Sequence, residues 1–181
     1  MKIISLEGSY STGKSTVFDR LPKNKGTIYT PDLAREYLNK NRLNSNSMNN
    51  NQKKDLQLFV SASYLGGMKQ AVHAQKDLVQ DSSLITAYAY SEDVLSPSTL
   101  ATMAYELAKY RDHMFALVFP PTIHLENDGL RHIDPEFRVE IHKRIMNVIQ
   151  AFDIPYQYIV SQMIDDRVAE AEAYIQEVTK Q

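Results

Sequence analysis

The chain has 181 residues, which suffice for one domain, or for one domain with a small lid. A net charge of −2 gives no general electrostatic case for binding nucleic acid or a membrane surface, and no stretch approaches the roughly 20 apolar residues that a membrane span needs. Cysteine is absent, which excludes disulfides and thiol chemistry, and the apolar run at the N-terminus is too short for a signal peptide, so we expect a soluble, cytoplasmic protein.

Short apolar runs alternate along the chain with longer segments of helical period. In chain order, the pattern predicts a strand at 3–6, a helix at 14–21, a strand at 27–30, helices at 32–39 and 52–75, a strand at 78–81, helices at 84–92 and from 97, a strand at 114–119, a helix from 135 to about 152, a strand at 156–160 and a closing helix at 168–178. This alternation indicates an α/β fold with a mainly parallel sheet of about five strands and helices on both faces. No repeat or linker divides the chain, so we expect a single domain over residues 1–181.

Two segments are expected to be loops. Residues 41–52 are rich in Asn and Ser, a composition that disfavours regular structure and predicts a mobile surface loop. Residues 120–138 follow the fourth strand and begin with two prolines, and we expect them to form a lid. Within that segment, Asp134 and Pro135 are typical of a helix start, with the aspartate as N-cap.

The segment Gly8–Ser15 fits the phosphate-binding pattern G-x-x-x-x-G-K-[ST] in full. It follows an apolar strand and opens a helix, which is the context that the pattern requires; a glycine-rich turn with an exposed lysine is the alternative. The glycines let successive N–H groups surround an anion, and the helix N-terminus adds its positive dipole end. Lys14 would reach the β- and γ-phosphates, and the Ser15 hydroxyl is a hard ligand for Mg²⁺. The residues expected to bind the nucleotide phosphates are Gly8, Ser11, Thr12, Gly13, Lys14, Ser15 and Thr16.

Four later segments accompany this loop: Asp32–Tyr37, Asp81–Thr86, Asn127–Arg131, and Ile154–Tyr156 followed by Asp166 and Arg167. In their order and spacing they resemble the small P-loop nucleoside kinases, such as the ribosylnicotinamide kinase domain of the NadR proteins, and the related ATPase-like proteins of bacteria and phages. The sequence departs from the family pattern at Ser83, where the family has an acidic residue, and at Gln80 in the preceding strand. The resemblance implies a P-loop three-layer sandwich that uses ATP and Mg²⁺ and acts on a small-molecule nucleoside or nucleotide.

Two aspartates follow predicted strands and are candidate catalytic residues. Asp81 would bind Mg²⁺, directly or through water, or alternatively cap the helix at 84–92. Asp32 would accept the proton of a substrate hydroxyl and orient that hydroxyl toward the γ-phosphate, or alternatively cap the next helix. The sequence leaves open which of the two is the base. On the long helix, Phe59 and Tyr64 are candidates to line a base pocket, although such residues are more often core.

Four arginines are candidate ligands of phosphate or substrate. Arg35, one turn after Asp32, would hold a substrate phosphate or ribose, or pair with Asp32 and orient it. Arg131 and Arg138 flank the lid and would neutralise charge on the transferred phosphoryl group, with Arg138 also a candidate substrate ligand; solvated surface arginines are the alternative. The resemblance implies that Arg167 lies near the adenine, and a solvated helix residue is again the alternative.

The leading hypothesis is therefore an ATP-dependent kinase that transfers the γ-phosphate to a hydroxyl of a nucleoside or nucleotide-like substrate. The acceptor could instead be a monophosphate, or a modified base or end in DNA or RNA, in which case the basic residues between 23 and 54 would contact the backbone. A nucleotide-dependent regulatory ATPase ranks third. The guanine-specifying Asn-Lys-x-Asp motif is absent from the sequence, and so is a long Walker B strand ending in Asp-Glu. ATP over GTP is inferred from the resemblance, and the sequence does not give the oligomeric state.

Overall fold

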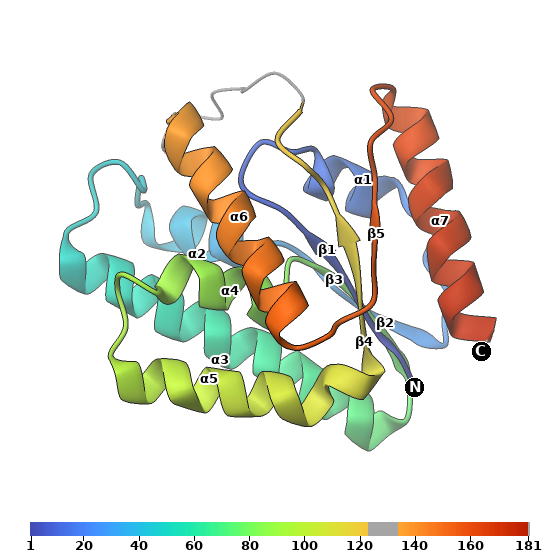
Figure 1. The fold of residues 1–181 in the computed structure, drawn as a ribbon, viewed down its shortest axis with the longest axis horizontal. Coiled ribbons are helices and arrows are strands. Elements are labelled where there is room, and N and C mark those ends of the chain that lie inside the picture. The colour runs from blue at the N-terminus through green and yellow to red at the C-terminus, as the bar shows by residue number, and fades with distance from the viewer. Residues whose placement is uncertain (123–133, 181) are drawn as a thin grey trace.

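The computed structural model describes residues 1–122 and 134–180, and its strands form one five-stranded parallel sheet (Figure 1). The strands are β1 (Ile3–Glu7), β2 (Thr27–Thr30), β3 (Asp77–Asp81), β4 (Met114–Val118) and β5 (Tyr156–Tyr158). Their order across the sheet is β2-β3-β1-β4-β5, so β1 lies in the centre and β2 and β5 form the edges. The predicted α/β class and the mainly parallel sheet are confirmed.

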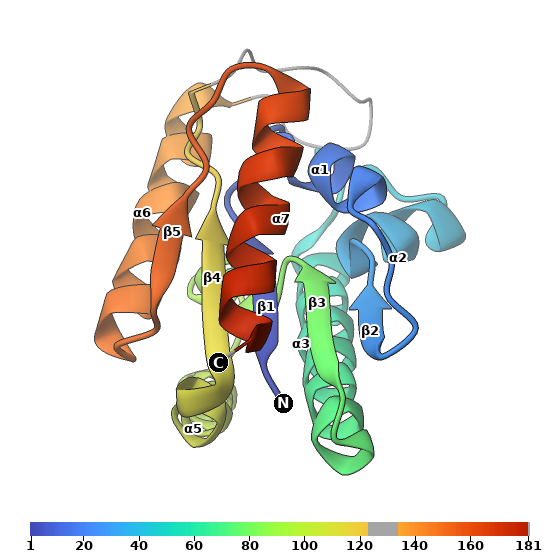
Figure 2. The same cartoon turned by 90° about the vertical axis from the view of Figure 1, so that its right-hand side faces the viewer.

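Helices cover both faces of the sheet. They are α1 (Lys14–Arg20), α2 (Leu33–Asn41), α3 (Asn50–Ala74), α4 (Leu84–Ser91), α5 (Pro97–Tyr110), α6 (Pro135–Ala151) and α7 (Ile164–Lys180), with a 3₁₀ turn at Arg111–His113. Helices α1 and α7 pack together on one face, and the remaining helices lie on the other; Figure 2 shows α7 in front of the sheet and α3 behind it. Within the described ranges, no helix is long and apolar enough to cross a membrane.

Alternating side chains of the central strands supply the two halves of the core. Ile3 and Leu78 point into the cluster beneath α3 to α6, whereas Ile4 and Val79 point into the smaller cluster beneath α1 and α7. Every residue of β1 is buried. A parallel sheet covered on both faces explains why its central strand reads as a nearly continuous apolar run rather than as an alternating pattern.

The Asn-rich loop is shorter than the sequence predicts. Helix α2 continues to Asn41 and α3 already begins at Asn50, so the connecting segment covers 42–49 and not 41–52. The reason is a capping box: the side chain of Asn49 accepts from the N–H of Gln52, and the side chain of Gln52 accepts from the N–H of Asn49. Asparagine disfavours a helix interior, but at the N-cap position it starts a helix.

The carboxyl ends of three neighbouring strands bring the candidate site together. The phosphate-binding loop follows β1, Asp32 follows β2, and Asp81 is the last residue of β3. In an open parallel sheet these ends meet at one edge, and the chain continues from β1 to a helix on one face and from β3 to a helix on the other. Such a switch point is where α/β proteins form their ligand-binding crevices.

Candidate functional site

The loop between β1 and α1 has the backbone that an anion cradle needs. Ser11 and Gly13 have left-handed φ angles of 52° and 84°, and Gly13 is the N-cap of α1. Gly8 has a φ of 155°, and a Cβ placed on it would stand 2.6 Å from the carbonyl oxygen of Phe119. Only glycine therefore fits at position 8, because a side chain would collide with the backbone that follows β4.

Two buried arginines bind the outer carbonyls of this loop. Arg138 of α6 donates from Nε to the carbonyl of Tyr10 at 3.2 Å and from its Nη2 to that of Ser11 at 2.7 Å. Arg167 of α7 donates from Nη1 to the carbonyl of Thr12 at 2.9 Å. In a trans peptide the C=O and the next N–H point in opposite directions. Fixing these carbonyls therefore turns the following N–H groups away from the arginines, toward the side where phosphates would bind.

The two arginines differ from what the sequence predicts. Arg138 is 5% exposed and Arg167 is 2% exposed, so the alternative of solvated surface residues is wrong for both. Burial lowers the pKa of each guanidinium group. Both arginines contact the loop backbone, and Arg167 also donates from Nε to the carbonyl of Ser161 before α7. Contact with substrate by Arg138 or with adenine by Arg167 stays a prediction. Arg131 lies outside the described residues, as does most of the expected lid.

Lys14 is buried inside the loop rather than exposed, so the alternative of an exposed lysine is wrong. Its Nζ donates to the carbonyl of Ser9 at 2.8 Å and lies 3.4 Å from Oγ1 of Thr12. Ser15 follows in the first turn of α1 and is half-buried, and Thr16 is exposed. An ammonium group held by a carbonyl and a hydroxyl of the loop is already placed where an anion would be bound.

The two aspartates lie on either side of a buried tyrosine. Asp32 caps α2, accepting from the N–H of Arg35 at 3.1 Å, and its other oxygen lies 3.8 Å from Nε of Arg35. Asp81 is 1% exposed at the end of β3. Tyr64 of α3 donates its hydroxyl to the carbonyl of Asp81 at 3.0 Å. Burial, together with the negative charges of Asp32 and Asp81, raises the pKa of Tyr64 well above its usual value.

These positions decide between some of the alternatives. Asp32 is an N-cap, as one alternative predicts, and its side chain also lines the cavity described below, so the structural and catalytic roles are compatible. Arg35 pairs with Asp32, which fits the orienting role. The N-cap of α4 is Ser83, which accepts from the N–H of Ile85, so the capping alternative for Asp81 is wrong. Asp134 caps α6 as predicted.

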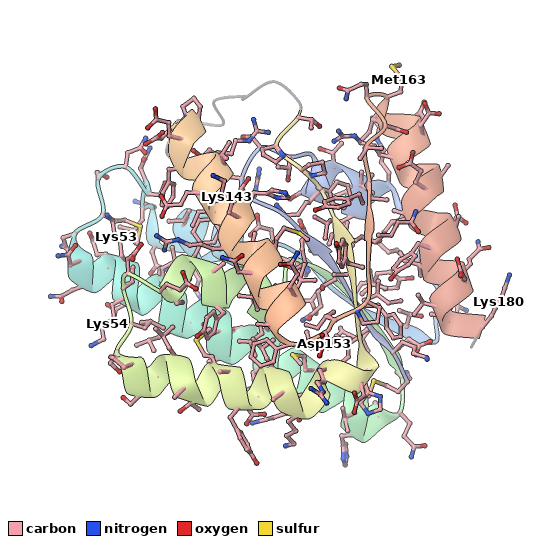
Figure 3. All side chains as sticks on the ribbon, in the orientation of Figure 1. Lys53, Lys54, Lys143, Asp153, Met163 and Lys180 are labelled. Atoms are coloured by element: carbon pink, nitrogen blue, oxygen red, sulfur yellow. The ribbon has the colours of Figure 1, made fainter. Side chains whose placement is uncertain are left out.

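A cavity of about 460 Å³ opens beside the phosphate-binding loop. It is lined by Gly8, Lys14 and Asp32, and further lining residues come from α3, α4 and α6. Most of the wall is apolar, and Tyr90 and Phe137 form an edge-on aromatic pair with centroids 6.2 Å apart. Polar residues of the lining include Gln57, Thr86, Asp93 and Arg144. Lys53, near the start of α3 (Figure 3), also lines the cavity. A mostly apolar cavity with a few polar groups is typical of a small-molecule site.

Glu7 is a site residue that sequence reasoning missed. It is fully buried at the end of β1 and accepts hydrogen bonds from the hydroxyls of Ser83 and Thr86 at the start of α4. Its one signal in the sequence is an acidic residue that ends an apolar run directly before Gly8. Thr86 lines the cavity, so Glu7 connects the central strand to the cavity wall.

Comparisons with known proteins agree with this geometry. A family model described as an AAA domain matches residues 3–167. No curated protein sequence matches the chain. Among solved structures, a NadR protein in complex with NR aligns with a TM-score of 0.73 and 20% identity, covering 99% of this chain and 52% of that one. A NadR protein in complex with NAD and AMP-PNP aligns with a TM-score of 0.68 and 18% identity, covering 98% and 49%.

A second fold relative matches end to end. Thymidylate kinase from Ehrlichia chaffeensis aligns with a TM-score of 0.61 and 10% identity, covering 98% of both chains. The chain thus spans about half the length of the NadR chains and nearly the whole length of the thymidylate kinase. At these identities the similarity shows a shared fold.

Proposed function

The chain belongs to the AAA domain family, and from this premise we propose that it is an ATP-dependent kinase that transfers the γ-phosphate to a hydroxyl of a nucleoside or nucleotide-like substrate. The observation that carries the proposal is the cavity of about 460 Å³ that is lined by both Lys14 and Asp32. A nucleotide hydrolase needs room only for water beside the γ-phosphate. A largely apolar cavity that begins at the phosphate-binding lysine suits an organic acceptor.

Phosphoryl transfer depends mainly on positioning and on stabilising charge. The loop N–H groups and Lys14 would hold the β- and γ-phosphates, with Arg138 and Arg167 keeping the loop in shape from behind. Asp32, which lines the same cavity as Lys14, would accept the hydrogen bond of the acceptor hydroxyl and direct its oxygen toward the γ-phosphate. Arg35 would hold Asp32 in that orientation. A lid including Arg131 would add positive charge.

The donor set near the loop suits Mg²⁺. Ser15 offers a hydroxyl in the first turn of α1, and Asp81 offers a carboxylate at the end of the strand beside β1. Magnesium is usually held by one or two such protein oxygens together with substrate phosphates and water. When bound, the ion would neutralise charge on the phosphates.

Nucleosides and nucleotides are the first acceptors to test. The cavity has the size of a small-molecule site. Of the fold relatives, the NadR protein was solved with NR, and the thymidylate kinase is named for a nucleotide substrate. The aromatic pair of Tyr90 and Phe137 offers edges and faces against which a base would pack.

The test offers the protein ATP labelled at the γ-phosphate, Mg²⁺ and a panel of nucleosides, nicotinamide riboside, nucleoside monophosphates and DNA with modified pyrimidines. We expect label to move to one small molecule and to be lost with Lys14→Ala. Lys25→Ala changes an exposed lysine away from the site and serves as the matched control. Transfer only to DNA would replace the proposed acceptor class, and release of phosphate without any labelled acceptor would overturn the kinase.

A further inference from the structure

We propose that Glu7 is a positioning residue that fixes the hydroxyl of Thr86 as a hydrogen-bond acceptor, so that the cavity selects an acceptor substrate carrying a donor group at that point. The inference rests on the proposed function, because it assigns a specificity element to the same cavity. It concerns a residue outside the phosphate-binding motif and the two candidate aspartates.

The Glu7 carboxylate accepts hydrogen bonds from two hydroxyl groups at the start of α4. One oxygen accepts from the hydroxyl of Ser83 and the other from the hydroxyl of Thr86. An ionised carboxylate only accepts hydrogen bonds, and each hydroxyl has a single hydrogen to give. Both hydroxyl hydrogens are therefore directed at Glu7 and away from the cavity.

The hydroxyl oxygens of Ser83 and Thr86 differ in whether their lone pairs are used. The oxygen of Ser83 accepts from the N–H of Ile85 at 3.1 Å and so caps α4. Thr86, by contrast, lines the cavity, and among the described residues no donor reaches its oxygen. With its hydrogen committed, Thr86 can offer only lone pairs to a ligand. A free threonine hydroxyl would rotate and serve as either donor or acceptor.

Thr86 lies in the cavity beside the phosphate-binding loop. Thr86 shares the cavity lining with Gly8, Lys14 and Asp32, so it belongs to the same site as the phosphate-binding loop. Asp32 also offers acceptor oxygens. The polar groups that line the cavity thus include two acceptors, which suits an acceptor substrate with a second hydroxyl or N–H besides the hydroxyl that is phosphorylated.

A purely structural role does not explain Glu7 well. It is 0% exposed in the centre of the sheet, and burying a carboxylate carries a desolvation penalty that two neutral hydroxyls only partly offset. Apolar residues could pack β1 against α4 without that penalty. Control of hydroxyl polarity is something an apolar residue does not provide.

The first experiment needs no substrate. Hydroxyl hydrogens held by a buried carboxylate exchange slowly, and we expect NMR signals for the Ser83 and Thr86 hydroxyls with contacts to the Glu7 side chain. In Glu7→Gln the amide has one acceptor oxygen and one donor nitrogen, so one of the two signals should be lost. A Thr86 hydroxyl without contact to Glu7 would overturn the inference. Because this result does not depend on catalysis, it separates failure of the inference from failure of the proposed function.

The second experiment uses the acceptor that the labelling assay identifies and its deoxy analogues. We expect Glu7→Gln and Thr86→Val each to raise the KM for that acceptor about tenfold, the loss of one hydrogen bond, while the Kd for AMP-PNP changes less than twofold. Thr86→Ser keeps the hydroxyl and should restore the wild-type KM. Ser61→Ala is the control, because Ser61 is buried on α3 but does not line the cavity.

A double variant distinguishes positioning from general damage. If Glu7 acts through Thr86, Glu7→Gln combined with Thr86→Val should have the KM of Thr86→Val alone. The deoxy analogue that lacks the donor group bound by Thr86 should bind to the wild type and to Thr86→Val with equal affinity. Additive effects in the double variant, or an unchanged KM in Thr86→Val, would overturn the inference. If Glu7→Gln fails to fold, the comparison of Thr86→Val with Thr86→Ser and the wild-type NMR spectrum still test the inference.

Discussion

Replacing Arg138 with methionine tests whether the buried arginines shape the phosphate-binding loop. Methionine keeps much of the volume but removes donors to the carbonyls of Tyr10 and Ser11, at 3.2 and 2.7 Å. Each hydrogen bond from a charged group contributes about 1.5–3 kcal/mol, and the Tyr10 carbonyl would be left buried. Allowing for relaxation and for relief of the buried charge, we expect the free energy of unfolding to fall by about 2–4 kcal/mol, a large part of the 5–15 kcal/mol typical of a domain.

The same substitution should weaken nucleotide binding. Without the arginine, the peptide groups after Tyr10 and Ser11 are free to rotate, so binding phosphates must first reorder the loop. We expect the Kd for AMP-PNP to rise at least about tenfold, or ~1.4 kcal/mol. Urea unfolding would give the stability change, and isothermal titration calorimetry at a temperature where the variant is folded would give the affinity.

The chain offers a matched control in Arg20. Its Nη1 lies 3.0 Å from Asp165, but the two side chains are 52% and 89% exposed, so this ion pair should contribute less than about 1 kcal/mol. Arg20→Met therefore removes an arginine and its ion pair without touching the loop. If Arg138→Met and Arg20→Met gave the same stability and the same affinity for AMP-PNP, the loop would not depend on the buried arginine and the reasoning would be refuted.

Three further predictions concern the loop, the buried tyrosine and the aspartates. Gly8→Ala places a Cβ 2.6 Å from a backbone oxygen, so it should lower the free energy of unfolding by about 2 kcal/mol or more and abolish binding of AMP-PNP. Gly26→Ala is the control: a Cβ there has no atom within 4 Å, and thermal unfolding should be unchanged. Equal effects of the two variants would contradict the geometry. Because the pKa of Tyr64 is raised in the folded state, the unfolded chain loses this proton above pH ~10 while the folded chain keeps it. The free energy of unfolding should therefore hold below that pH and fall above it. Urea unfolding of Tyr64→Phe should lack this part of the decline. Asp32→Asn should lower kcat about 100-fold at unchanged Mg²⁺ requirement, and Asp81→Asn should raise the Mg²⁺ concentration for half-maximal activity; the reverse pattern would exchange their proposed roles.

Several features could be predicted because neighbouring residues determine them. The pattern Gly8–Ser15 needs only the strand before it and the helix after it, and both are present. Asp134 is an N-cap because its own side chain accepts from the N–H groups two and three residues later. The same local logic overestimates the loop at 41–52, because Asn49 caps α3 instead of extending the loop and α2 continues to Asn41.

The contacts that shape the site could not be predicted in this way. Arg138 and Arg167 bind the loop from positions 127 and 155 residues distant in sequence. The partner of Glu7 in the cavity wall, Thr86, is 79 residues away. Nothing in the spacing of Tyr64 along α3 shows that its hydroxyl would meet the end of β3.

The sequence by itself therefore determined the α/β class, the order of its elements and the strand–loop–helix arrangement around Gly8–Ser15, since periodicity and local hydrogen bonding depend on neighbours along the chain. Only the tertiary structure decided which buried charges support that loop and which residues surround the cavity beside it. Those choices depend on the packing of α3, α4, α6 and α7 against the carboxyl end of the sheet, where side chains meet that are far apart in sequence.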